Sequence, residues 1–145
     1  KLLQQMNADI IETMKELPED ERQIYSYSNP NVVHQRFEDY VYEDGGIVDQ
    51  RRLYKIYNKA IVADGPTAQD LVGNDEIDLR EIIVLSEDKF PFKNDITLYS
   101  NKMAIQSLRN EVIGVVIESS EIVQDQLARF ELAWVGAHAL AAGNK

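Results

Sequence analysis

Apolar residues recur at every third or fourth position over the first 17 residues, and this spacing predicts an amphipathic helix. Pro18 follows directly and ends the helix, because proline cannot continue the helical hydrogen bonds. Leu3, Ile10 and Leu17 also repeat every seven positions, a spacing typical of a helix that pairs with the same helix of a second copy in a dimer. Packing of the same stripe on the chain's own domain is the alternative. The stripe consists of Leu3, Met6, Ile10, Met14 and Leu17.

Between residues 18 and 75, short apolar runs alternate with turn residues. Glycine, proline and asparagine favour turns, and they separate these runs at three places: Asn29-Pro30, Gly45-Gly46 and residues 64–66. The predicted order is a strand over 24–27, a helix over 31–45, a helix running into a strand over 47–63 and a helical turn over 68–72.

The second half of the chain has a clearer pattern. Gly114 lies inside the last apolar run, which suits close approach in a packed sheet. Serines 119 and 120 can cap a following helix, and the tail beyond it is expected to fray. The predicted elements are strands over 79–85, 96–99, 102–108 and 112–117, the last two joined as an antiparallel hairpin, and a helix from about Ser120 to Ala141.

Together these elements predict an α/β fold with a mixed central β-sheet, flanking helices and an N-terminal linker helix. We expect residues 1–17 to form a linker and dimerisation helix and residues 18–145 to form a single α/β domain. A chain of 145 residues is long enough to bury a substantial core.

Composition narrows the possible functions. The chain has no cysteine, which excludes disulfides and thiolate metal sites and suits a cytoplasmic location. It contains no run of 18 apolar residues, so we expect no membrane association. The formal net charge of −10 repels nucleic acid, so DNA contact would need another segment.

Motifs for catalysis are missing from the sequence. The glycines form no phosphate-binding loop, and His34 and His138 lie far apart in unlike segments. Acidic pairs such as Glu87-Asp88 fall in turns, where carboxylates are solvated. We therefore expect no enzymatic activity, no cofactor and no metal site.

One loop combines features that suit a small ligand. Between Asp88 and Asn94, two aromatic residues flank a proline and two lysines surround them, which offers both stacking and anion contacts. The alternative is that the aromatic residues anchor the loop to the core while the lysines stay in solvent. The residues concerned are Lys89, Phe90, Phe92 and Lys93.

The stretch from Leu79 to Trp134 resembles the C-terminal part of TrmB-type transcriptional regulators of archaea and bacteria. The similarity lies in an arginine-led strand, a Phe-Pro loop, the segment ITLYSNKMAI at 96–105, the strand IGVVIE at 113–118 and the helical FELAW at 130–134. These motifs occur in the family's order over about 55 residues. The resemblance is loose over residues 18–75.

The resemblance implies a phospholipase-D-like fold, a dimerising linker helix and an effector-sensing domain whose DNA-binding winged helix is missing from this chain. Tyr99 and Lys102, from the ITLYSNKMAI strand motif, complete the candidate ligand-binding set with the loop residues. A phospholipase-D-like phosphodiesterase or a bare interaction scaffold are alternatives. The enzyme requires an H-x-K motif, and neither histidine is followed by lysine at that spacing.

Overall fold

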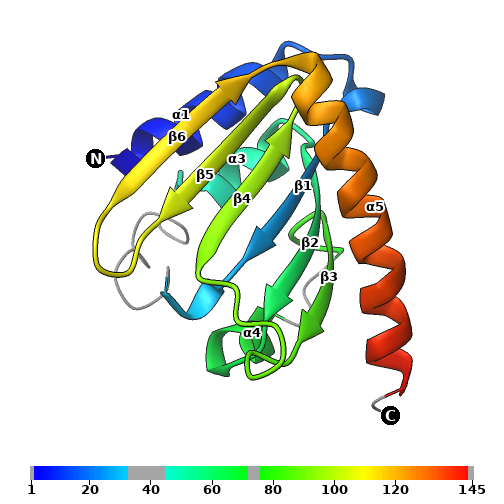
Figure 1. Cartoon of the computed structure of the whole chain (residues 1–145). Helices are drawn as coiled ribbons and strands as arrows, with labels where there is room; N and C mark the ends of the chain where they lie inside the picture. Colours follow the sequence, from blue (N-terminus) through cyan, green and yellow to red (C-terminus); the bar gives the residue numbers. More distant parts are fainter. Residues whose placement is uncertain (1, 33–44, 72–75, 144–145) are drawn as a thin grey trace.

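The computed structural model describes residues 2–32, 45–71 and 76–143, which form one mixed α/β sheet structure. Six strands lie in the order β3-β2-β1-β4-β5-β6, with β1 to β3 parallel and β4 to β6 an antiparallel meander (Figure 1). The strands are β1 Gln23–Ser28, β2 Tyr57–Ala63, β3 Arg80–Leu85, β4 Asn94–Tyr99, β5 Lys102–Ser107 and β6 Ile113–Glu118. The predicted fold class, a mixed sheet with flanking helices and an N-terminal helix, is confirmed.

Helices cover both faces of this sheet. Figure 1 shows α5 in front of the sheet and α1 and α3 behind it. The helices are α1 Leu2–Lys15, α3 Ile47–Leu53, α4 Pro66–Leu71 and α5 Ser120–Gly143, with a short 3-10 helix at Glu19–Glu21. No helix in the described ranges is long and apolar enough to cross a membrane.

The face of the sheet under α5, the α5 face, carries a buried apolar cluster around Phe130. Phe130, with no exposed surface, contacts the ring edges of Tyr25 and Tyr27 and stacks on Trp134. Each fully buried side chain of this size stabilises the fold by about 1.5 to 3 kcal/mol before ordering costs. The buried cluster comprises Ile61, Ile83, Leu85, Leu98, Met103, Val123, Phe130, Trp134 and Ala137.

The start of α5 is fixed by a serine cap, as the sequence predicts. The backbone N–H of Ile122 donates to the hydroxyl of Ser119 at 3.2 Å, which satisfies one free donor of the first turn. The helix runs to Gly143, two residues beyond the predicted end near Ala141, and fraying of the tail stays a prediction. Ala137 and Ala141 pack against the core and hold the last turns.

Helix α1 packs on the opposite face, here named the α1 face. Leu3, Met6, Ile10 and Met14 are at most 5 % exposed, and Leu17 packs partly against the same cluster. Their contacts come from the chain itself, through residues such as Ile24, Ile56, Tyr99 and Ala104. The apolar stripe of α1 therefore packs on the chain's own sheet, which is the alternative to a dimer contact, because these side chains are already covered. Dimer formation itself stays a prediction.

Gly114 confirms the expected close approach. It lies on β6 opposite Gln106 of β5, and a Cβ atom added there would collide with the sulfur of Met6 on α1. Glycine at this position therefore lets α1 lie directly on the outer strands of the sheet. The helix predicted over 31–45 falls mostly outside the described residues, whereas the predicted helix-to-strand segment over 47–63 is confirmed as α3 and β2.

Candidate functional site

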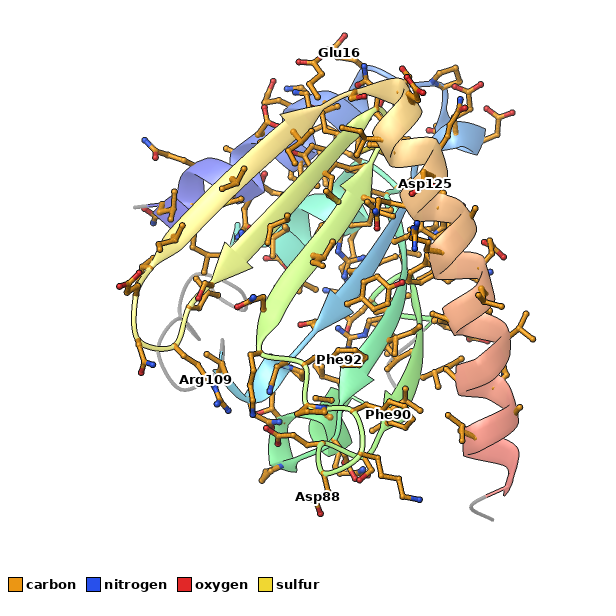
Figure 2. All side chains as sticks on the ribbon, in the orientation of Figure 1. Glu16, Asp88, Phe90, Phe92, Arg109 and Asp125 are labelled. Carbon is orange, nitrogen blue, oxygen red and sulfur yellow. The ribbon has the colours of Figure 1, made fainter. Side chains whose placement is uncertain are left out.

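The loop between β3 and β4 places its four candidate residues in two different environments, and ligand binding by them stays a prediction. Phe90 and Phe92 are partly buried against the α5-face core, where Phe92 contacts the ring of Tyr27. Lys89 and Lys93 are exposed, and Lys93 lies 3.7 Å from the carboxylate of Glu87. The loop lies at one end of the sheet (Figure 2). This arrangement matches the alternative in which the aromatic residues anchor the loop.

The other two candidates, Tyr99 and Lys102, lie at the opposite end of β4. Tyr99 is buried, and its hydroxyl donates a 2.7 Å hydrogen bond to Asp9 of α1. Burial and this hydrogen bond raise the pKa of Tyr99 above its ordinary value. Lys102 reaches the same carboxylate at 3.3 Å and donates to Thr13 at 3.0 Å. These two residues attach α1 to the sheet and are not brought together with the 88–94 loop.

The structure instead shows a cavity on the α1 face that the sequence did not predict. It has a volume of about 180 Å³ and lies between the sheet, α1 and α3. Its floor is formed by strand residues, which is where a packed sheet normally carries apolar side chains. The polar floor residues are Ser26, Asn58, Arg80, Asp95, Thr97 and Gln106.

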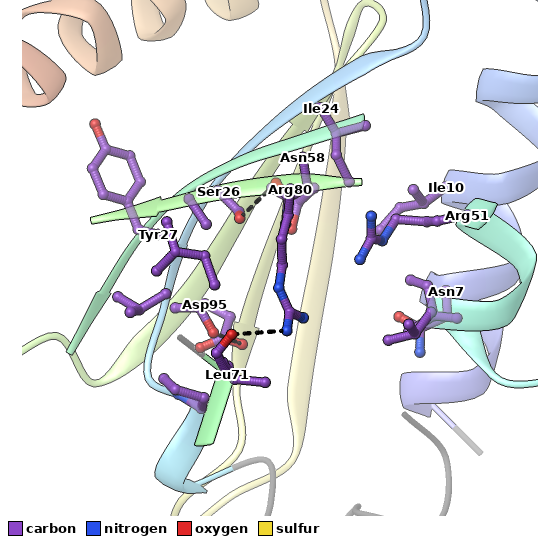
Figure 3. Close-up of a pocket in the computed structure, with 18 of the residues that line it drawn as sticks. Asn7, Ile10, Ile24, Ser26, Tyr27, Arg51, Asn58, Leu71, Arg80 and Asp95 are labelled. Carbon is purple, nitrogen blue, oxygen red and sulfur yellow. Dashed lines mark hydrogen bonds between the residues drawn. The ribbon is translucent and has the colours of Figure 1, made fainter. Parts of the chain in front are cut away.

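The register explains how these polar side chains gather. Asn58 of β2 pairs with Arg80 of β3, Ser26 of β1 pairs with Thr97 of β4, and Asp95 of β4 pairs with Gln106 of β5. Paired residues of neighbouring strands point to the same face, so all six belong to the α1 face. The hydroxyl of Ser26 donates to the amide oxygen of Asn58 at 3.1 Å (Figure 3).

Arg80 reaches into the cavity from the edge strand β3. Its side chain is 7 % exposed, and its Nη2 forms a 2.8 Å ion pair with Asp78 and donates to the carbonyl of Leu71 at 3.3 Å. Figure 3 shows the side chain directed along the cavity. Its Nε is buried and has no hydrogen-bond partner. An unsatisfied buried donor costs about 1 to 3 kcal/mol, and the surrounding side chains leave this atom essentially no accessible surface.

A second buried arginine, Arg51, lies on the side of the cavity formed by α3. It is 4 % exposed, and its Nη1 donates to the carbonyl oxygens of Asp78 and Leu79 at 2.8 and 3.3 Å. These bonds tie α3 to the turn before β3. Guanidinium groups are always charged in proteins, so Arg51 and Arg80 each bring a positive charge to the cavity, and Asp78 is paired with that of Arg80.

Asp95 lies on the other side of the floor. Its two carboxylate oxygens accept hydrogen bonds from the backbone N–H of Asn29 at 3.0 Å and from the hydroxyl of Ser28 at 3.2 Å. Burial raises the pKa of the Asp95 carboxyl to about 6, although these two hydrogen bonds oppose the shift. No lysine or arginine of the described residues forms an ion pair with it.

Among the described residues, no three histidine, aspartate or glutamate side chains are placed to hold a metal ion. His138 lies on α5, edge-on to Trp134 at 5.2 Å, and so belongs to the other side of the sheet. His34 lies outside the described residues.

Sequence reasoning missed the cavity because its polar residues alternate with apolar ones along each strand. That pattern is typical of a sheet face in contact with solvent. In the strand QIYSYS the serines alternate with the two tyrosines, and the tyrosines turn out to pack under α5. One signal in the sequence could have indicated the cavity. Predicted helices precede and follow these strands, and together they are sufficient to cover both faces of the sheet.

Comparison with known proteins supports the fold. No family model matches the sequence, and no curated protein sequence matches it. A solved structure with the same fold is that of TrmBL2, an archaeal chromatin protein described as showing a novel mode of DNA binding. The two chains align with a TM-score of 0.56 at 11 % sequence identity, over 90 % of this chain and 48 % of TrmBL2. This chain, which spans about half the length of TrmBL2, therefore has a fold found in an archaeal TrmB-like protein.

Proposed function

We propose that this chain is the effector-sensing domain of a transcription regulator and that the effector binds in the α1-face cavity. The observation that carries the proposal is the α1-face cavity itself, whose floor has six polar side chains, Arg80 and Asp95 among them. Buried polar groups normally have partners, so a cavity lined by several of them is suited to a ligand.

Two further observations support a regulatory role. The fold is shared with TrmBL2, which is described as DNA-binding, and TrmBL2 contains about as much chain again beyond the matched region. The net charge of −10 disfavours contact between this domain and phosphate groups. We therefore assign DNA binding to another segment of the regulator. The resemblance described above implies that this segment is a winged helix. We further propose that the regulator is a cytoplasmic homodimer.

The competing function is phosphodiester hydrolysis by a phospholipase-D-like site. That chemistry uses a histidine nucleophile with a lysine to hold the phosphate. His138 is separated from the cavity by the sheet, and the residue two positions after it is Leu140. The hydroxyl of Ser28 donates to Asp95 at 3.2 Å, but no histidine is among the described residues that line the cavity, so we propose a binding role and no catalysis.

The cavity assignment is tested by thermal unfolding of the chain with a panel of small metabolites. We expect at least one compound to raise the melting temperature of the wild type, because a ligand that binds only the folded state stabilises it. In Ala60→Leu the added carbons occupy the cavity, since Ala60 is 4 % exposed and lines it. The shift should disappear there and persist in Leu132→Ala, on the exposed side of α5. A shift retained in Ala60→Leu contradicts this location.

The assignment of DNA binding to another segment is tested with the chain alone. Binding to duplex DNA should be weak at physiological salt, because the domain offers little positive charge for counterion release. Tight binding that weakens steeply with added salt would show that this domain itself contacts DNA. Hydrolysis of a generic phosphodiester that is lost in His138→Ala would instead favour the enzyme.

A further inference from the structure

We infer that the outer edge of β6 pairs in antiparallel fashion with β6 of a second copy of the chain, so that two sheets join into one. The inference rests on the homodimer of the proposed function and names the surface that forms it, and the α1-face cavity takes no part. It follows from the free backbone of β6, its exposed apolar side chains and the lack of charge along this edge.

The backbone of β6 has one edge that carries no other strand. In the described parts of the chain, β6 is the last strand of the sheet and pairs with β5 alone. The N–H of Ser119 donates to the carbonyl of Asn101 at 2.9 Å across this ladder. Because N–H and C=O groups alternate in direction along an antiparallel strand, those of Gly114, Val116 and Glu118 point away from β5. These groups can form a ladder with a further strand.

The side chains of β6 are apolar on both faces of the sheet. Ile113 and Val115 belong to the α5 face, and Val116 belongs to the α1 face next to Gly114. Helix α5 runs along the side of the sheet that carries β2 and β3, away from β6 (Figure 1). Val112, Ile113, Val115 and Val116 are therefore 41 to 48 % exposed. Apolar residues on both faces are typical of an interior strand, so this strand has the sequence of one that is covered on both sides.

The edge of β6 lacks the features that normally prevent pairing with another chain. Edge strands are usually protected by charged side chains, by proline or by a bulge. Residues 112–117 contain no charged residue and no proline, and the register with β5 is continuous from Ile113 to Glu118. At the other edge of the sheet, β3 begins with Arg80 and Glu81. The unprotected edge of the sheet is thus β6.

The direction of the free backbone groups restricts how two copies can pair. Only even-numbered residues of β6 point outward, so they must lie opposite even-numbered residues of the second copy. The two-fold axis is then perpendicular to the sheet, and both α5 faces lie on the same side. The register with the most pairs places Val115 opposite Val115 of the second copy and Ile113 opposite its Ile117. These side chains form one apolar cluster across the join.

Charge favours a second copy at this edge over a head-to-tail contact through β3. Each copy carries a net charge of −10, and the β6 edge is a part of the surface where two such copies approach without facing charges. Glu118 lies opposite Val112 of the second copy in this register, so no two carboxylates are paired. The contact is also closed, since a two-fold join uses the same edge of both copies.

The size of the contact sets the expected affinity. One strand ladder buries less than the about 800 Å² per partner of a standard interface, so we expect a Kd in the micromolar range. The two copies of α1 lie on the same side of the joined sheet and add contacts there, since a Cβ atom on Gly114 would collide with Met6. Added salt should strengthen the dimer, because it screens the repulsion between two acidic copies.

The first test is disulfide cross-linking, which the absence of cysteine from the chain makes specific. In the inferred register the two Val115 Cα atoms lie about 4.5 Å apart, within the range of about 4.4 to 6.8 Å that a disulfide spans. Val115→Cys should therefore form a cross-linked dimer under mild oxidation. Ile113→Cys is the matched control, because its two copies lie four positions apart along the strands, about 14 Å. A mixture of Ile113→Cys and Ile117→Cys should cross-link as a heterodimer.

The second test is sedimentation of variants that weaken the pairing. Val115→Lys places two like charges opposite each other and should raise the Kd at least about tenfold, whereas the uncharged Val115→Thr should dimerise. Val116→Pro removes an outward N–H and keeps the ladder with β5, so it should also dissociate the dimer. Leu132→Lys, on the exposed side of α5, should leave the Kd unchanged. Circular dichroism establishes that each variant is folded.

Three outcomes would overturn the inference. A dimer that persists in Val115→Lys and in Val116→Pro would show that the copies meet elsewhere, and the proposed homodimer would stand without this surface. A wild type that is monomeric at millimolar concentration would overturn the surface and the homodimer together, whereas the effector site keeps its own test in Ala60→Leu. Cross-linking of Ile113→Cys as readily as Val115→Cys would contradict the antiparallel register.

Discussion

The hydroxyl of Tyr99 donates a 2.7 Å hydrogen bond to the carboxylate of Asp9, and this bond joins the end of β4 to the middle of α1. Lys102, the partner of Tyr99 in the β4–β5 ladder, lies 3.3 Å from the same carboxylate. Three polar groups thus hold α1 at one end of the sheet, while its apolar stripe packs on the rest. The attachment of α1 can therefore be weakened without removing any apolar contact.

Tyr99→Phe should lower the free energy of unfolding by about 1 to 2 kcal/mol, because the hydrogen bond to a charged group is lost and the ring stays in place. Urea unfolding followed by circular dichroism measures the change. Tyr57→Phe is the matched control, since Tyr57 is 46 % exposed. Equal effects of the two substitutions would show that the Asp9 bond contributes nothing specific.

The raised pKa of Asp95 predicts a dependence of stability on pH. A carboxyl whose pKa rises from 3.8 to about 6 on folding favours the folded state at low pH, and this contribution is lost as the pH rises through 6. The wild type should therefore lose about 1 to 3 kcal/mol relative to Asp95→Asn between pH 4 and pH 7. Urea unfolding of both proteins across this range measures the difference. A difference that is constant with pH contradicts the assigned shift.

Phe130→Ala should destabilise the fold by about 3 to 5 kcal/mol, since the ring is fully buried between Tyr25, Tyr27 and Trp134 and its removal leaves a void. Leu132→Ala, two residues along the same helix, should change stability by less than about 0.5 kcal/mol because Leu132 is 76 % exposed. Thermal unfolding of the two variants separates the two sides of α5. Similar losses for both would mean that the outer side of α5 is also covered, for example by a second copy.

Ile10→Asp tests whether the apolar stripe of α1 packs on its own sheet or forms a dimer contact. Ile10 is 3 % exposed against its own sheet, so a carboxylate there should unfold or strongly destabilise the chain. Ala8→Asp, at an exposed position of the same helix, should leave the fold intact. Light scattering and circular dichroism report size and folding together. A folded Ile10→Asp monomer derived from a wild-type dimer would restore the stripe as a dimer contact.

Most of the fold could be predicted because its elements depend on local patterns. The spacing of Leu3, Met6 and Ile10 predicts α1, and Ser119 predicts the start of α5. Gly114 is a further example, since a glycine within an apolar strand indicated a close approach that Met6 makes. Such signals lie within a few residues of the structure that they determine.

The cavity could not be predicted because it depends on the order of the strands. Arg80 and Asp95 are close in sequence but project from β3 and β4, which lie three places apart in the sheet. No local pattern tells whether a polar position in a strand faces water or an opposing helix. The side chains of the 88–94 loop predict a ligand site by their chemistry, but no local pattern shows that Phe90 and Phe92 pack against the α5-face core.

The order of the strands also bears on how the chain folds. β4, β5 and β6 are joined by short turns, so their contacts are local and can form early. The pairing of β1 with β4 joins Tyr27 to Ile96, which are 69 positions apart, and requires closure of a long loop. The floor of the cavity includes strands from both halves. A ligand bound there should consequently slow global unfolding, and hydrogen exchange in β1 and β4 should become slower together when the cavity is occupied.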